Sequence, residues 1–273
     1  MIDKVEVRTI SGDLLTLTLA DASNGYAVSD IQGLDPVKAT IVSSDFAQMD
    51  GSQYQNSSRS ERNIVIAISF EPNYDTTTVR SLRSNAYSFF MPKSYVNLRF
   101  YLDEGLIVET TGRVESFEAP LFTDDPKAAI SILCFDPDFI ETTPIVVSGS
   151  TVSSTTEFGV TYEGTSDTGF VFVLSVNRTL GEFSIYQHAP DGSLRSMDFA
   201  AALVSGDIVT ISTVDGDKRV TLTRSGSTTS LLYGLSPQSP WLKLQHGVNN
   251  LRVHAVGAAI PFTITYKDRY GGL

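Results

Sequence analysis

Cysteine, tryptophan and histidine are scarce in this chain of 273 residues, which has one cysteine, one tryptophan and three histidines. The single cysteine, Cys134, excludes a disulfide within the chain and a metal site built from several cysteines. It lies in an alternating apolar segment, so we expect a small core residue. No apolar run approaches about 18 residues, so no membrane insertion is expected. The chain should therefore be stabilised by packing and assembly.

Charged residues are also sparse, at 19% of the chain, and their net charge of −11 is unevenly distributed. Residues 1–142 hold 11 lysines and arginines against 21 acidic residues, whereas residues 143–273 hold 9 against 10. An acidic surface argues against tight nucleic-acid binding, which depends on cationic side chains at phosphates. Asp3 and Glu6 are acidic, whereas a secretory signal peptide would have a basic region followed by an apolar stretch at these positions. We therefore expect a mature N-terminus.

Alternation of apolar and polar residues predicts an all-β fold. In residues 15–19, leucines alternate with threonines, as a half-buried strand requires. Similar runs occur at residues 64–70, 98–102, 106–115, 130–135, 170–176, 208–213 and 262–266. Asp191-Gly192 and Asp215-Gly216 separate alternating segments and predict hairpin turns, because this dipeptide tolerates positive φ. The second half therefore indicates a β-sandwich of the jelly-roll or lectin-like kind.

One helix is expected, over about residues 75–90. Asp75 can cap its N-terminus and Pro92 can end it. Five apolar residues at three- and four-residue spacing form one face of this helix: Val79, Leu82, Ala86, Phe89 and Phe90. A single amphipathic helix in a β-rich chain most often covers the apolar side of a sheet.

Two domains are expected, residues 1–142 and 143–273, with the boundary between Asp138 and Ser154. The chain there is rich in Ser, Thr, Gly and Pro, a composition that commonly joins domains, and the charge balance changes at the same place. A second polar stretch, Ser43–Arg62, lies within the first domain. Its few apolar anchors predict a long loop or an arm that reaches a neighbouring subunit.

No residue pattern indicates catalysis, a cofactor or a metal. The histidines lack the spacing of a helical metal pair, and no serine lies in a nucleophile elbow. These histidines are His188, His246 and His254. The acidic groupings Asp124-Asp125 and Asp215/Asp217 adjoin Pro or Gly, which is typical of turns. The chain is therefore not expected to be an enzyme.

Three aromatic residues of the second half leave a binding function open. Trp241 can anchor the core of a sandwich or form a platform on which a sugar stacks. Tyr186 and Tyr233 are further candidates for sugar stacking. They support the alternative hypothesis of a carbohydrate-binding adhesin that recognises host-surface glycans.

Short motifs follow one another in a definite order along the second half: a Gly-Asp strand start, a hairpin, Trp-x-x-Leu, a Gly-x-Asn turn and a final Tyr-x-x-Arg-Tyr. The residues concerned are Trp241, Gly247, Asn249, Arg269 and Tyr270. In the first half, a Cys-Phe-Asp-Pro motif containing Asp136 and Pro137 closes the domain. In this order the motifs resemble those of siphophage distal tail proteins, and the motifs of the second half resemble the C-terminal part of that family. His246 stands where the family often has proline.

The resemblance implies a structural virion protein of the phage tail tip, made in the host cytoplasm. It implies an N-terminal β-sandwich or split-barrel-like domain and a galectin-like or carbohydrate-module-like C-terminal β-sandwich. The N-terminal domains would form a closed ring, typically of six, between the tail tube protein and tail-tip, hub or receptor-binding proteins. DNA would pass through the channel without specific binding, and an acidic lining would repel its phosphates.

Overall fold

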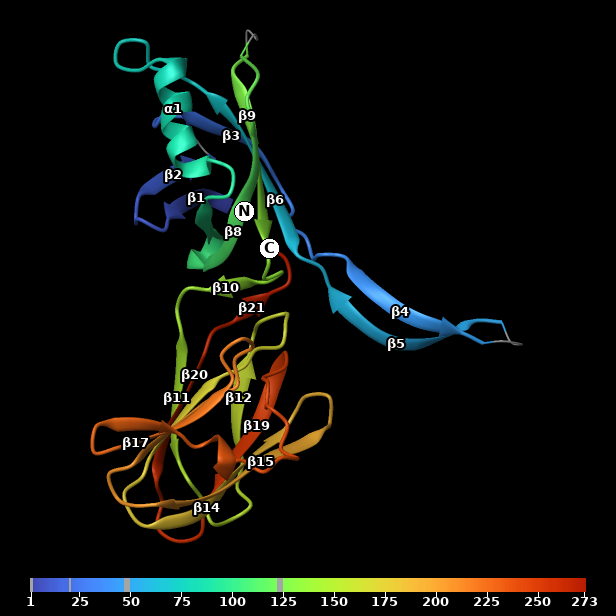
Figure 1. Ribbon diagram of the computed structural model, residues 1–273, viewed down its shortest axis with the longest axis vertical. Helices are drawn as coiled ribbons and strands as arrows, with labels where there is room; N and C mark the ends of the chain where they lie inside the picture. The colour runs from blue at the N-terminus through green and yellow to red at the C-terminus, as the bar shows by residue number, and fades with distance from the viewer. Residues whose placement is uncertain (1, 20, 47–49, 122–124) are drawn as a thin grey trace. The chain divides into compact units, whose positions relative to one another are not determined.

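The computed structural model describes residues 2–19, 21–46, 50–121 and 125–273 (Figure 1). The chain forms two compact units, a first unit of Met1–Thr142 with Tyr270–Leu273 and a second unit of Thr143–Arg269. The predicted β-rich fold with one α-helix is confirmed over the described residues. The second domain was predicted to run to Leu273, whereas Tyr270–Leu273 belong to the first unit. Their partners lie far away in the sequence, so no local pattern could reveal this return.

A nine-stranded sheet forms most of the first unit. Its main path is β2-β1-β7-β8-β9-β6-β3, antiparallel throughout, and β10 pairs with β8 and β21. The expected sandwich or split barrel is thus realised as one sheet, with a short 3-10 turn, Asp103–Gly105, between β7 and β8. The strands are β1 Ile2–Thr9, β2 Leu14–Thr18, β3 Tyr26–Gln32, β6 Arg62–Phe70, β7 Tyr95–Leu102, β8 Ile107–Glu118, β9 Lys127–Cys134, β10 Phe139–Glu141 and β21 Arg269–Tyr270.

The helix α1, Val79–Phe90, lies over this sheet and contacts β1 and β6 (Figure 1). Its buried residues are Leu82, Ala86, Phe89 and Phe90, on the predicted apolar face. The expected cap at Asp75 was wrong. Thr78 is the N-cap: its Oγ accepts from the Ser81 amide at 3.2 Å, and Ser81 Oγ accepts from the Thr78 amide at 2.9 Å. This reciprocal capping box satisfies two amides at once, which Asp75 could not do from three residues earlier.

Two sheets form the second unit, with orders β11-β20-β13-β16-β17-β18 and β12-β19-β14-β15, and all of these pairs are antiparallel. A 3-10 turn, η2 Leu232–Gly234, follows β18. The strands are β11 Ile145–Ser150, β12 Phe158–Tyr162, β13 Val171–Ser175, β14 Leu180–His188, β15 Leu194–Leu203, β16 Ile208–Ser212, β17 Arg219–Arg224, β18 Ser227–Ser230, β19 Gly247–His254 and β20 Pro261–Tyr266.

These two sheets pack face to face around one core. The rings of Phe172 from β13 and Phe183 from β14 stack with centroids 6.3 Å apart. The polar stretch predicted to join the domains contains a strand, because β11 pairs with β20 along its whole length. Gly149 is required there, since a Cβ would lie 2.6 Å from the ring of Phe262. A composition typical of a linker is therefore part of an edge strand.

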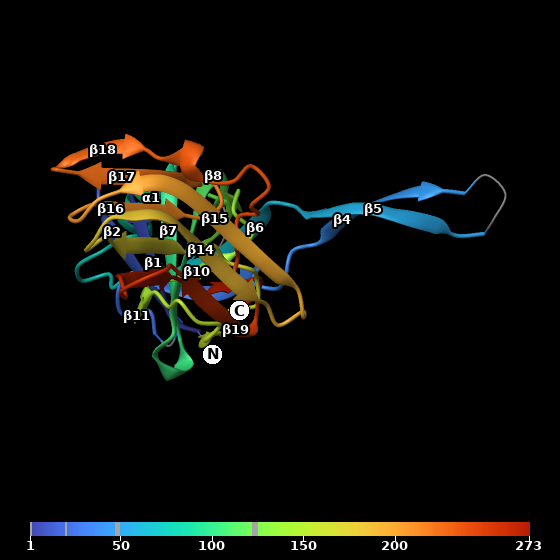
Figure 2. The same ribbon diagram turned by 90° about the horizontal axis from the view of Figure 1, so that it is seen from below.

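The remaining strands, β4 Ala39–Asp45 and β5 Ser52–Arg59, pair with each other in a separate two-stranded sheet. Both views show this hairpin extending away from the large sheet of the first unit (Figures 1 and 2). We call β4 and β5 the arm. The predicted stretch Ser43–Arg62 includes residues 47–49, which lie outside the described part of the chain.

Candidate functional site

The arm is exposed along its whole length. Every residue of β4 and β5 is solvent-exposed, and Ile41, Val42 and Tyr54 are each more than half exposed. Among the described residues, neither strand pairs with any strand outside the arm. An isolated two-stranded hairpin is marginally stable in water, and its free edges offer unpaired backbone groups. The arm is therefore a surface suited to a partner chain.

An ion pair fixes the end of β5. Both terminal nitrogens of Arg59 donate to the carboxylate of Asp138, with Nη2 lying 2.9 Å from Oδ2. The Asp138 side chain is only 3% exposed, whereas that of Arg59 is 41% exposed. Such a two-point contact restricts orientation as well as distance, because the planar guanidinium matches the carboxylate. The first strand of the large sheet to follow the arm, β6, thus begins beside a fixed point.

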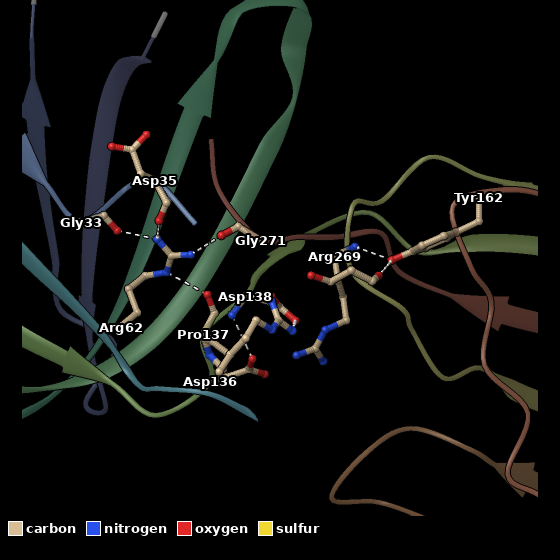
Figure 3. A network of polar contacts seen from close by, with 11 residues as sticks. Gly33, Asp35, Arg62, Asp136, Pro137, Asp138, Tyr162, Arg269 and Gly271 are labelled. Carbon is tan, nitrogen blue, oxygen red and sulfur yellow. Dashed lines mark hydrogen bonds and ion pairs between the residues drawn. The ribbon is translucent and has the colours of Figure 1, made fainter. Parts of the chain in front are cut away.

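Arg62 is the second anchor at the base of the arm (Figure 3). It is fully buried, and its guanidinium donates to four backbone carbonyls. These acceptors are the carbonyls of Gly33, Asp35, Pro137 and Gly271. Its guanidinium carbon also lies 4.3 Å from the ring centre of Phe139. Burial lowers the pKa of Arg62, but the four carbonyls compensate for the lost hydration of the cation.

Three of the residues in the motifs that resemble distal tail proteins, Asp136, Pro137 and Tyr270, lie in the first unit. Asp136 Oδ1 accepts from the Asp138 amide at 3.1 Å, and the Pro137 carbonyl accepts from Arg62 Nε at 2.8 Å. Tyr270 packs against the core of the first unit. Arg269 ends the second unit, and its amide donates to the Tyr162 hydroxyl at 3.0 Å (Figure 3). These positions shape the backbone, and none of them forms a cavity with reactive groups.

The other residues of these motifs lie in the second unit. Asn249 is fully buried, and its amide nitrogen donates to the carbonyls of Gln245 and Gly247 at 2.7 and 3.2 Å. Gly247 has φ of 102°, a conformation that favours glycine. Trp241 is half-buried and packs against the core of the second unit, which fits the core-anchor interpretation. Together they hold the turn before β19.

The catalytic interpretation gains no support from the geometry. Among the residues that the structure describes, no group of three His, Cys, Asp or Glu side chains could hold a metal. Asp215 pairs with Lys218 and Lys243, and Asp217 pairs with Arg219, so these carboxylates belong to turn ion pairs. Asp124 lies outside the described residues. No helix in the described ranges is long and apolar enough to span a membrane.

Cys134 is buried in the first core, and burial raises the pKa of its thiol, as expected of a core residue.

Sequence reasoning missed the role of Arg62, although a signal was present. In β6, residues 62, 64, 66, 68 and 70 are buried and the intervening residues are not. Arg62 therefore occupies a core-facing position in register with isoleucines. A buried arginine needs several acceptors, so a charge at such a position indicates a polar network beneath the strand.

Comparison with known proteins identifies the second unit. Residues 163–270 match the family described as siphovirus-type tail component, C-terminal domain. The chain is similar in structure to SPP1 Dit (gp 19.1), described as a paradigm of hub adsorption apparatus in phages infecting Gram-positive bacteria. That match has a TM-score of 0.68 and 14% identity, and covers 97% of this chain and 98% of the other. A chain of the phage P2 baseplate in its activated conformation with Ca gives a TM-score of 0.47, 10% identity and coverage of 97% and 98%.

No curated protein matches the chain in sequence. At 14% identity, the likeness to SPP1 Dit shows a shared fold across both units. The family match provides the identity of the second unit and confirms the resemblance found in the sequence motifs. Residues 163–270 thus match the siphovirus-type tail component, C-terminal domain, and the whole chain shares the fold of SPP1 Dit.

Proposed function

We propose that the chain is a structural protein of the tail tip that assembles through its first unit into a closed ring. The ring joins the tail tube protein to tail-tip or receptor-binding proteins, and six copies is the number implied by the resemblance to distal tail proteins. The description of SPP1 Dit as part of a hub adsorption apparatus supports this role, because that protein shares the fold. The second unit carries the match to the tail-component domain.

The observation that carries this proposal is the anchored, coreless arm. Its base is held by Arg59 and Arg62, whereas every residue of β4 and β5 is exposed to solvent. A ring needs two different complementary patches on each subunit, since a head-to-tail interface repeats until it closes. The arm is one such patch. It adds its strands or its apolar side chains to a neighbouring copy and gains there the packing that it lacks in the monomer.

DNA transit is the second part of this function. The first unit has an excess of acidic residues, with 21 against 11 lysines and arginines in residues 1–142. A channel lined by this unit repels phosphates, so DNA passes without binding to it. Full-length protein should accordingly give no gel shift with duplex DNA at low salt, where cationic DNA-binding proteins bind most tightly. A salt-sensitive shift would argue against this part.

Arm removal tests the ring. In the hairpin, Ala39 pairs with Arg59, so an Asn-Gly turn can replace residues 40–58 and keep both residues in register. This design spares Arg59 and Arg62, which a deletion of Ser43–Arg62 would remove. Light scattering after size exclusion should show a ring for the full chain and a monomer for the armless variant. Armless protein that still forms the ring would contradict the proposal.

A double substitution in the arm tests the ring without removing the arm. Ile41→Ser with Val42→Ser removes the exposed apolar groups of β4 without shortening the arm. Val146→Ser is the matched control, because Val146 is a similarly exposed strand valine in the second unit. Only the arm variant should weaken the ring, measured as the protein concentration at which half of the chains assemble.

A further inference from the structure

The outer face of the sheet β12-β19-β14-β15 carries an ordered array of hydrogen-bonding side chains. Residues at alternate positions of β14, β15 and β19 face away from the core of the second unit. Strand register aligns them in rows. Ser184 lies opposite His254 on one side and Asp198 on the other, and the next row contains Arg252, Tyr186 and Ser196. This outward face is polar across three strands, as a face in contact with water can be.

One end of this face is hollowed into a cavity of about 550 Å³. Strand residues form its floor, and the segment around η2 forms a wall. Six of its lining residues can bind or stack on a polar ligand: Glu182, Ser184, Tyr186, Asp198, Tyr233 and His254. The volume falls within the roughly 300–1,000 Å³ typical of small-molecule sites. Trp241, which the sequence also suggested for sugar stacking, does not line this cavity.

Tyr233 lies in the wall and is 82% exposed. Exposed aromatic rings are costly in water, and a ring beside a polar cavity offers an apolar platform at its edge. Tyr186 is held more firmly, because the guanidinium carbon of Arg252 lies 4.1 Å from its ring centre. The site thus combines the exposed ring of Tyr233 with the ring of Tyr186, which Arg252 holds in place.

Several polar groups near the cavity have unused hydrogen-bonding capacity. Within the described residues, His254 Nδ1 and Arg252 Nε are buried atoms without a hydrogen-bond partner. Asp198 accepts from the Ser196 hydroxyl at 3.0 Å, so its carboxylate is oriented before any ligand arrives. Buried polar atoms without partners are uncommon, so these groups are candidates for contact with a polar ligand. The carboxylates can accept hydrogen bonds from the hydroxyl groups of a sugar, and the nitrogens can donate hydrogen bonds to them. The exposed ring of Tyr233 can pack against an apolar face of the sugar.

We propose that this cavity binds a neutral saccharide unit of a cell-surface glycan. Tyr233 stacks on the sugar ring. Asp198 and Glu182 accept hydrogen bonds from the sugar hydroxyl groups, and His254 contributes a further polar contact. The two carboxylates select against uronic or sialic acids, because no lysine or arginine lines the cavity to pair with an acidic sugar. This inference goes beyond the structural role proposed above, and ring formation does not depend on it.

Binding of the full-length protein to an array of neutral and acidic glycans tests the inference, followed by titration of the best neutral hit. Tyr233→Ala and Asp198→Asn should each weaken binding roughly tenfold or more, since each removes a stacking contact or a charged hydrogen bond to the sugar. Tyr74→Ala is the matched control, because Tyr74 is 80% exposed but lies in the first unit. It should bind as the unchanged protein does.

Three outcomes would overturn the inference. The first is an array on which no neutral glycan binds. The second is binding that survives both cavity substitutions, which would place the sugar elsewhere. The third is preferential binding of acidic glycans, which would contradict the role of the carboxylates. Light scattering on the same samples reports ring formation separately, so loss of glycan binding in an intact ring contradicts only the saccharide site.

Discussion

Arg59, the last residue of β5, contacts Asp138 with both terminal guanidinium nitrogens, across 79 positions of sequence. Asp138 lies between β9 and β10, after the last long strand of the first unit. This ion pair therefore connects the arm to a segment that is distant in the sequence. Arg62 repeats the arrangement three residues later with carbonyl acceptors. The arm is therefore exposed to solvent but held firmly at its base.

Replacing Arg59 should loosen the arm. Arg59→Met deprives the nearly buried Asp138 carboxylate of its two-point partner and should cost about 1–2 kcal/mol, between the values for exposed and buried pairs. Arg59→Lys keeps the charge but not the planar fork, so its effect should be intermediate. Hydrogen exchange should accelerate in β4 and β5 and remain unchanged in β14 and β15. Equal effects of both substitutions would show that the fork geometry does not matter.

Arg62→Ala should destabilise the first unit by about 3 kcal/mol or more, because it removes the donor to four backbone carbonyls in a buried site. Arg178→Ala is the control. Arg178 also donates to backbone carbonyls, those of Ala258, Val256 and Thr179, but these bonds lie at an exposed site where water can replace them. Calorimetry should show a large fall in melting temperature for the first variant and a small one for the second. Similar shifts would contradict the importance of burial.

Acid should weaken the first unit through Glu6. Burial alone would raise the pKa of this carboxyl, but hydrogen bonds from Arg8 and Lys4 outweigh it and hold the pKa at about 2, against an ordinary 4.5. Because the folded-state pKa is the lower one, the stabilisation is fully present above about 4.5 and is lost as the pH falls toward 2. It amounts to at most about 3 kcal/mol.

Urea denaturation of Glu6→Gln between pH 6 and pH 2.5 measures this contribution. The variant should be less stable at pH 6 and should lose less stability on acidification than the unchanged protein. Parallel curves for the two proteins would rule Glu6 out as the source of acid sensitivity.

Ring assembly should strengthen from low to moderate salt. The first units carry net negative charge and repel one another, and salt shortens the range of this repulsion to about 10 Å at 0.1 M. Light scattering at 10 mM and 150 mM NaCl should show assembly at a lower protein concentration in the second buffer. Assembly that weakens over this range would indicate that attractive ion pairs dominate the interface.

The proposed structural role predicts that the histidines are dispensable for assembly. His188 is exposed, and His246 contacts the Gly164 carbonyl at 3.2 Å, so neither forms part of a reactive group. The triple substitution of His188, His246 and His254 by glutamine should leave ring formation nearly unchanged. His254→Gln should reduce only glycan binding. Loss of ring formation in a correctly folded triple variant would reveal a missed site.

The local pattern of the chain determined most of its secondary structure. Alternation in residues such as 64–70 predicts β6 because a strand at a core must bury every second side chain. The buried helix face and both Asp-Gly hairpins also follow from spacing within a few residues. The helix start was misplaced, since Asp75 and Thr78 are both good caps and only the backbone path decides between them.

Tertiary structure alone decided what those elements do together. The four acceptors of Arg62 come from positions as far apart as Gly33 and Gly271, and the return of Tyr270–Leu273 to the first unit depends on the same contacts. The row of His254, Ser184 and Asp198 exists only because three strands pair in one register. Register and pairing are set by contacts between distant segments, and a shift of one residue would turn these side chains into the core. The spacing of residues along the sequence does not determine this pairing and register.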